Sequence, residues 1–259
     1  MQISEKEMRD ALKEYFGERP LIFIKFTQKK EWAQDVLDGK LYMNKAGFYK
    51  ELEEKSGKKG QGDVGELQPK LTNVECTVIL NPTDKEKLIE IPFESKMVKL
   101  RYEEDMNYPL YCLTGLTIDE FIISEYSEKK VTLELPYSKM RIEEIENDFG
   151  RYAVVIPPSE FEERLYDSLS KEKVAWKFGK VKYRNNNNQD WLNDFINQSE
   201  ERFLYKDLDF SYQNEFRLVL DTEIENSMVF EIDSLNGIGH ILEIENLKSL
   251  RLTMNLQMR

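Results

Sequence analysis

The sequence predicts an α+β fold, in which helices flank a single mixed and largely antiparallel sheet. Two observations predict this class. Short runs of β-branched and aromatic residues recur along the chain between turn signals, as strands do. A few stretches among them carry apolar residues at helical spacing. The 259 residues contain no Pro- or Ser-rich linker, so we expect a single domain over 1–259.

The first elements follow from spacing and from residues that begin or end helices. Ser4 precedes a run of apolar residues at helical spacing, and Pro20 ends that helix. The next run, LIFIKF, is apolar enough for a buried strand, and Thr27 behind it is expected to cap a second helix. We therefore expect a helix over 3–16, a strand over 21–26, a helix that ends at Gly39 and a strand over 41–44.

The rest of the chain is rich in strands. Runs of strand-forming residues predict strands over 74–80, 87–93, 97–102, 110–116, 131–135, 151–156, 174–183, 210–220, 228–232 and 247–254. We expect helices over 137–148, behind Ser159 and around Trp191. Ser159 and Glu162 have the spacing of a capping box, which favours a helix start at Ser159.

The segment 50–69 predicts a mobile exposed loop, because it combines four glycines with charges of both signs. Lys58 and Lys59 could hold a phosphate or cover a site as a lid, although the ending of a Walker loop is absent. A plain linker is the alternative. Asp63 and Glu66 could orient a substrate or bind a hard cation, and the alternative is that both are solvated charges.

Composition excludes several classes of protein. The charges sum to -12, from 37 basic and 49 acidic residues, and an acidic chain is poorly attracted to nucleic acid phosphates. No apolar run approaches the ~20 residues of a membrane span, and the charged N-terminal segment differs from a secretory signal, so we expect a cytoplasmic protein that does not bind membranes. One histidine and two cysteines do not supply a zinc site, and we expect no metal.

Polar residues interrupt the strand predicted over 210–220. Strand alternation places Gln213, Glu215 and Arg217 on one face, ahead of a run of core-forming residues. If that face lines a cleft, Glu215 is a partly buried carboxylate held by Arg217 and Gln213. Such a carboxylate can stabilise a developing cation or position a hydroxyl. The alternative is a structural Glu-Arg pair on the sheet surface.

Lys25 is a second polar residue in an apolar strand, between Ile24 and Phe26. A buried ammonium group needs a partner or an exit to water. Glu215 is a candidate partner, and the open end of the strand is the alternative. We expect Lys25, Asn44 and Glu215 to converge in one concave pocket.

Five segments, taken in order, carry a resemblance to a known group. They are FIKFTQKKEWAQDVLDGKLYMN, the glycine-rich segment ending in GDVGE, YCLTGL, VKYRNN and YKDLDFSYQNEFRLVL. This order resembles that of uncharacterised domains in phage, prophage and abortive-infection loci. Those domains are in turn similar to the DNA-targeting ADP-ribosyltransferase toxins.

The resemblance implies an ADP-ribosyltransferase-like fold with NAD as the substrate. It places Glu215 as the catalytic residue, with Gln213 two residues earlier. It places the nicotinamide end of NAD at Lys25, Phe26 and Thr27, with Tyr42 and Asn44 beside it. The implied reaction transfers ADP-ribose to nucleic acid or protein in a conflict between phage and bacterium.

Two other functions stay open at this point. The chain could be a catalytically inactive domain of the same ancestry, whose acidic surface binds a bacterial defence protein as an inhibitor or as a component of the system. It could also be a structural phage protein that uses unpaired strands of its middle region as a contact surface. The oligomeric state is not indicated by the sequence.

Overall fold

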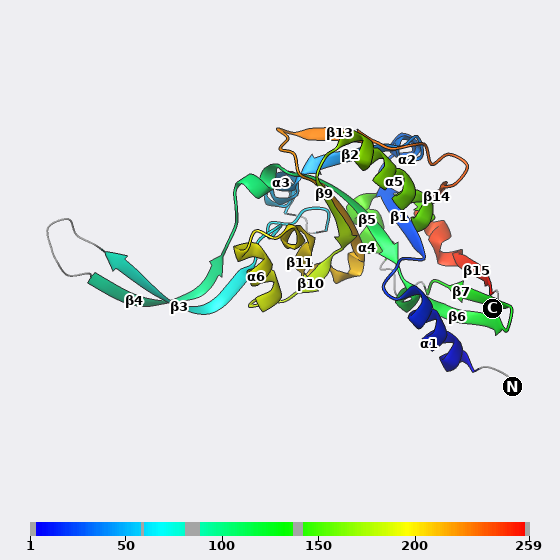
Figure 1. Cartoon of the computed structure of the whole chain (residues 1–259), viewed down its shortest axis with the longest axis horizontal. Helices are drawn as coiled ribbons and strands as arrows, with labels where there is room; N and C mark the ends of the chain where they lie inside the picture. The colour runs from blue at the N-terminus through cyan, green and yellow to red at the C-terminus, as the bar shows by residue number, and fades with distance from the viewer. Residues whose placement is uncertain (1–3, 58–59, 81–88, 137–141, 257–259) are drawn as a thin grey trace.

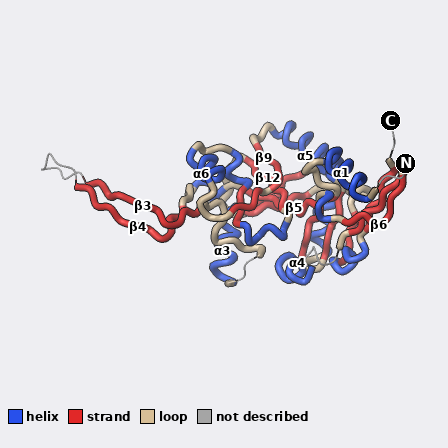
Figure 2. Tube along the Cα trace, turned by 90° about the horizontal axis from the view of Figure 1, so that it is seen from below, coloured by secondary structure: helices blue, strands red, loops and turns tan. Residues whose placement is uncertain are grey.

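The computed structural model describes residues 4–57, 60–80, 89–136 and 142–256, and it confirms the α+β class. A largely antiparallel central sheet with helices around it forms the body of the molecule. β3 and β4 extend from this body as a long two-stranded arm (Figures 1 and 2). Among the pairings of described strands, β10 with β11 is parallel and the others are antiparallel.

The bounds of the elements are as follows. The α-helices are α1 (Glu5–Phe16), α2 (Lys30–Leu37), α3 (Ala46–Ser56), α4 (Ile142–Phe149), α5 (Pro158–Glu172) and α6 (Gln189–Ile196). The strands up to β8 are β1 (Ile22–Thr27), β2 (Lys40–Lys45), β3 (Lys70–Leu80), β4 (Ile89–Lys99), β5 (Pro109–Leu116), β6 (Ile122–Ser127), β7 (Lys130–Glu134) and β8 (Tyr152–Ile156). The later strands are β9 (Trp176–Lys180), β10 (Lys182–Arg184), β11 (Tyr205–Asp207), β12 (Glu215–Leu220), β13 (Ser227–Glu231), β14 (His240–Glu243) and β15 (Arg251–Asn255).

β5 is the strand on which the central sheet is organised. The sheet runs β13-β2-β5-β1-β8-β14, and β12 joins β5 to β9. β12 pairs along one edge of β5, from Leu110 to Thr114. The other edge is shared, because β2 pairs with its first two residues and β1 with residues 114–116. Among the described strands, none therefore pairs with residues 111–113 on that edge, and the sheet is split there.

Two clusters of buried apolar side chains cover the two faces of the sheet. Neighbouring residues of β1 point to opposite faces, so Phe23 belongs to one cluster and Ile24 to the other. The Phe23 cluster includes apolar residues of α2 and α5, and the Ile24 cluster includes those of α1, β7 and α4. Because both faces are covered, a polar group in this sheet must find its partners inside the protein.

Most predicted elements are present close to their expected bounds. The first helix and its Ser4 cap are confirmed, with a capping box between Ser4 and Glu7. The helix behind Thr27 begins only at Lys30, and the Thr27 hydroxyl donates a hydrogen bond to the Lys29 carbonyl instead of capping the helix.

Other local predictions differ from the structure. α5 begins at Pro158, whose fixed φ suits the first turn, so Ser159 lies inside the helix. Within the described residues, the strands expected over 87–93 and 97–102 form one strand, β4, which ends at Lys99. The first part of the strand expected over 247–254 belongs to a 3-10 helix (Ile244–Ser249). β6 and β14 are strands that the sequence does not predict. The helix expected over 137–148 is present from Ile142, and 137–141 lie outside the described residues.

The prediction of an exposed loop over 50–69 is also wrong, and its mobility stays a prediction. Its first part is the end of α3, and most residues from 60 to 69 are buried. The Asp63 amide donates to the Tyr49 carbonyl, and Leu67 packs in a cluster with Leu110. These contacts hold the segment against the body. Lys58 and Lys59 lie outside the described residues.

None of the helices in the described part of the chain is both long enough and apolar enough to cross a lipid bilayer.

Candidate functional site

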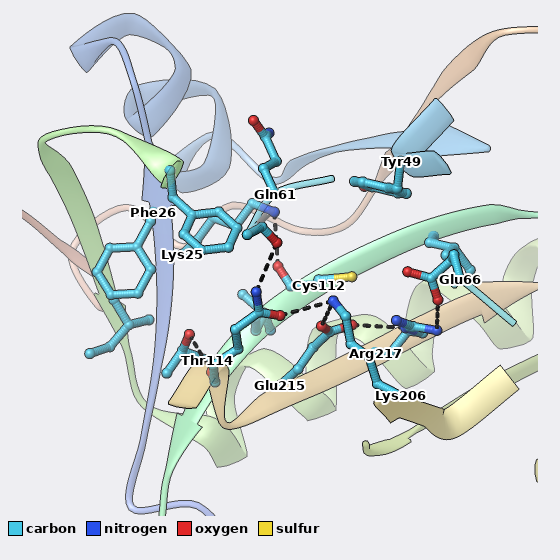
Figure 3. A pocket seen from close by; sticks show the side chains of 16 residues that line it. Lys25, Phe26, Tyr49, Gln61, Glu66, Cys112, Thr114, Lys206, Glu215 and Arg217 are labelled. Atoms are coloured by element: carbon cyan, nitrogen blue, oxygen red, sulfur yellow. Dashed lines mark hydrogen bonds and ion pairs between the residues drawn. The ribbon is translucent and has the colours of Figure 1, made fainter. Parts of the chain in front are cut away.

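A pocket of about 100 Å³ lies beside the split in the sheet (Figure 3). β1, β5 and β12 supply most of its walls, and residues 60, 61 and 66 of the segment behind α3 supply another. Lys206 comes from β11, Gln213 lies just ahead of β12, and three aromatic rings, those of Phe26, Tyr49 and Phe149, also line the pocket. The volume is below the roughly 300 Å³ of the smaller ligand pockets, so the cavity has room only for a small molecule or for one end of a larger one.

Glu215, the first residue of β12, lies at the floor of this pocket and is 4% exposed. One carboxylate oxygen accepts a hydrogen bond from Arg217 Nε at 2.8 Å, and the other accepts one from Lys206 Nζ at 3.0 Å. Burial alone would raise the pKa of Glu215, but the Arg217 and Lys206 cations hold this pKa well below its usual range. Glu215 is therefore an ionised carboxylate in a protein interior.

Arg217 is fully buried and joins two carboxylates. Its Nη1 donates to the Phe203 carbonyl at 2.8 Å and lies 2.8 Å from Oε1 of Glu66, while its Nε contacts Glu215. Burial opposes the charge of Arg217, and the carboxylates of Glu215 and Glu66 keep its pKa well above the usual value. The Glu-Arg pair is therefore part of an internal network and not a surface pair.

Lys206 is the member of this network that was not predicted. It is buried, and its ammonium group donates to the side-chain oxygen of Gln213 at 2.9 Å as well as to Glu215. Its pKa is raised because the nearby carboxylates, Glu215 foremost, outweigh the effect of burial. The sequence signal was weak, since a lysine in the short run YKD looks like an ordinary surface residue.

Gln213 belongs to the network, but it does so from a helix ahead of β12 and not from the strand that alternation predicts. It is the last residue of a 3-10 helix (Leu208–Gln213), and Asn214, with a φ of 45°, turns the chain into β12. The prediction that Gln213 lies in the strand is wrong. Its side chain accepts from Lys206 and donates to the Gly60 carbonyl at 2.9 Å, so it ties the segment behind α3 to the pocket floor.

Lys25 lines the same pocket but is not the partner of Glu215. Its Nζ donates to the Cys112 carbonyl at 2.8 Å, on the edge of β5 that lacks a strand partner, and lies 4.3 Å from the centre of the Tyr111 ring. Burial lowers the pKa of Lys25, and Cys112 and Glu215 partly offset that effect. Among the described residues, no carboxylate forms an ion pair with Lys25.

The other residues expected at the nicotinamide end are not together. Phe26 lines the pocket beside Lys25, whereas Thr27, Tyr42 and Asn44 are absent from its lining. Tyr42 is more than half exposed and pairs with Val229 on β13, and Asn44 lies where β2 meets both β13 and β5. The expected convergence is met for Lys25 and Glu215 and is wrong for Asn44, because β2 meets β5 at the opposite end from β1.

Asp63 and Glu66 are buried, so their interpretation as solvated charges is wrong. Glu66 pairs with Arg217, and Asp63 accepts a hydrogen bond from the Gly65 amide at 2.8 Å. Burial, together with the neighbouring charge of Glu66, raises the pKa of Asp63 to about 7, and Lys206 opposes this rise. Asp63 therefore changes its charge near neutral pH.

The pocket carries an excess of positive charge. Its lining contains Lys25, Lys206 and Arg217 against Glu66 and Glu215. The carboxylates pair with Lys206 and Arg217, whereas Lys25 forms no ion pair among the described residues and has N-H groups left to donate to a polar group of a ligand. Within the described residues, no group of histidine, cysteine and acidic side chains could hold a metal ion.

The fold and the site define an α+β protein whose largely antiparallel sheet is split. A pocket lies at the split, and most of the charged side chains that line it pair with one another. Comparison of the chain with family models, with curated proteins and with solved structures finds no match.

Proposed function

We propose that the chain is an ADP-ribosyltransferase-like enzyme that cleaves NAD in the pocket around Glu215. The observation that carries this proposal is the ionised Glu215 carboxylate at the pocket floor, held by two buried cations. A carboxylate that stays ionised in a water-poor cavity can accept a hydrogen bond from the ribose 2'-hydroxyl, and that bond strengthens as positive charge develops on the ribose. Breaking the bond between ribose and nicotinamide develops such a charge.

The hydrogen bonds that Glu215 accepts within the protein leave it able to accept another one from a substrate. A carboxylate has about four acceptor sites. Arg217 Nε and Lys206 Nζ each take one of them, and the Cys112 thiol forms a further hydrogen bond with this carboxylate. The site that remains can accept the ribose 2'-hydroxyl. The bonding electrons leave with nicotinamide, which becomes neutral, and a nucleophile then adds to the ribose carbon and loses its proton. The nucleophile is water or a group on a macromolecule.

The other pocket residues suit the nicotinamide end of NAD. Phe26 and Phe149 offer aromatic surfaces for a planar ring. Lys25 can donate a hydrogen bond to the carboxamide oxygen, because Cys112 supplies only one acceptor for its three N-H groups. The rest of the dinucleotide would extend out of the pocket, which is too small for all of it.

The test is NAD consumption by the purified chain. NAD labelled in the adenylate or in nicotinamide is incubated with it, with and without DNA and cell lysate, and nicotinamide release and label transfer are measured. We expect activity in the wild type and at least a hundredfold loss in Glu215→Gln. Asp105→Asn is the matched control, because Asp105 is a buried carboxylate that pairs with Arg202 outside the pocket lining.

Two results would reject the proposal. One is the absence of NAD consumption by the wild type under all of these conditions. The other is equal activity of the wild type and Glu215→Gln when each activity is divided by the fraction of folded protein at the assay temperature.

A further inference from the structure

The arm formed by β3 and β4 stands away from the body as a two-stranded sheet (Figures 1 and 2). An isolated two-stranded hairpin is marginally stable in water. The base of this arm is nevertheless firmly fixed. Asn187 donates its amide hydrogen to the Lys70 carbonyl, and its side chain exchanges two hydrogen bonds with Thr72. Lys70 also pairs with Asp207. The arm is thus anchored to the body as a projecting element.

One face of the arm carries an apolar stripe. From Val74 to Leu80 the register of β3 with β4 is continuous, so alternate residues lie on the same face, and the pairing is interrupted at Asn73, which has a φ of 53°. The stripe consists of Val74, Cys76, Val78, Ile91, Phe93 and Met97. Val78 is 42% exposed, and Ile91, Phe93 and Met97 are each 47–48% exposed. None of the stripe residues belongs to the hydrophobic clusters that the described residues form.

The reverse face of the arm is mixed, with Glu75, Glu90 and Glu94 beside Thr77, Pro92, Lys96 and the 60% exposed Ile79. Glu75 lies directly opposite Glu94. Like charges placed opposite each other destabilise a pair of strands. No cation among the described residues forms an ion pair with either of these two glutamates. The stripe therefore favours an apolar surface, and the pair of Glu75 and Glu94 favours a cation on the partner.

A second copy of this chain does not meet these requirements. Two arms packed stripe to stripe would bring together chains that each carry a net charge of -12. The same charge disfavours nucleic acid.

We propose that the arm inserts into a cleft of a basic partner protein, with one apolar wall and one wall of lysine and arginine side chains. The stripe contacts the apolar wall, and Glu75 and Glu94 contact the cations. Engagement of both faces roughly doubles the contact area that either face alone provides. Pro92 has no N-H group, which hinders the addition of another strand to the edge of β4 and favours contact through the faces.

The first experiment places the photo-crosslinking residue p-benzoylphenylalanine in the full chain in its native cells. It replaces Phe93 on the stripe, Thr77 on the reverse face, or Tyr126 on β6 as a control at an exposed position of the body. We expect both arm positions to form an adduct with the same basic protein, and the Tyr126 position to form none with it. Adducts with a second copy, a lipid or a nucleic acid, or no adduct, would overturn the proposal.

The second experiment measures binding of the purified adduct partner to the full chain. We expect Ile91→Ser with Phe93→Ser, and separately Glu75→Lys with Glu94→Lys, to raise Kd at least tenfold. The matched controls are Ile196→Ser and the pair Glu225→Lys with Glu245→Lys, which alter exposed residues of the body. Equal affinity of the arm variants and the wild type would also overturn the proposal. These readouts do not depend on NAD chemistry at Glu215.

Discussion

The ammonium group of Lys206 lies 3.0 Å from a carboxylate oxygen of Glu215, and both side chains are buried. β11 carries the lysine and the first position of β12 carries the glutamate, so the pair connects the parallel pair of strands β10 and β11 to the central sheet. Removal of either partner would leave an uncompensated charge in the interior, which is strongly destabilising. The pair is therefore structural, whether or not Glu215 is catalytic.

Replacement of Lys206 should change how stability depends on pH. The pKa of Glu215 is depressed in the folded chain, so its contribution to stability is present above about pH 4.3 and is lost as the pH falls below that value. In Lys206→Met one of the two cations is gone and the depression is smaller. We expect a loss of about 3–5 kcal/mol at pH 7 in urea unfolding, and a smaller loss at pH 3. Lys182→Met, at a half-exposed ion pair, should have little effect.

Asp63 should change the dependence of stability on pH in the opposite direction from Glu215. Its folded pKa of about 7 lies above the ordinary value, so the folded chain keeps a proton that the unfolded chain releases. This contribution makes stability fall as the pH rises from about 4 to about 7. Asp63→Asn should therefore stabilise the chain at pH 8, by at most about 4 kcal/mol at 1.36 kcal/mol per pKa unit, and have little effect at pH 4. The test compares the urea concentration at the midpoint of unfolding for the variant and the wild type at pH 4 and at pH 8. Asp233→Asn, at an exposed position, is the control. A constant difference between these midpoints would contradict the assignment.

Gly115 in β5 should not tolerate a side chain. A Cβ at this position would clash with the Phe216 ring, and Gly115 lies in the paired centre of the sheet, opposite Phe23. Overpacking of this kind costs about 1–3 kcal/mol, and we expect that loss for Gly115→Ala in thermal unfolding. The double variant Gly115→Ala with Phe216→Leu should lose less than the sum of the two single changes. Strict additivity would show that the ring is not the cause.

Asn187 should control the order of the arm. Its side chain accepts the Thr72 amide at 2.7 Å and donates to the Thr72 hydroxyl at 2.9 Å. Loss of such bonds costs about 1–2 kcal/mol, which corresponds to roughly tenfold faster local opening. Asn187→Ala should therefore accelerate hydrogen exchange at the Thr72 amide and leave the Leu218 amide in β12 unchanged. Unaltered exchange at Thr72 would mean that other contacts hold the arm.

The sequence by itself determined the fold class and most of the helices and strands. Apolar periodicity and caps such as Ser4 act within a few residues, so they can be read locally. The importance of Glu215 and Arg217 was also visible, because charged residues in a run of core-forming residues require buried partners. The position of Lys25 in the pocket followed from the same argument.

Only the tertiary structure decided which partners those residues have. Lys206 lies in a short strand whose pairing is set by distant segments, and local pattern does not distinguish it from a surface lysine. The segment 60–69 has the composition of a loop, yet its carboxylate at Glu66 is neutralised by Arg217 and it folds inward. The split in the central sheet depends on β1 and β2 sharing one edge of β5, which is a pairing between segments far apart in the chain. Burial and charge compensation are properties of the assembled chain, because electrostatic energies depend on the distances and surroundings that only folding creates.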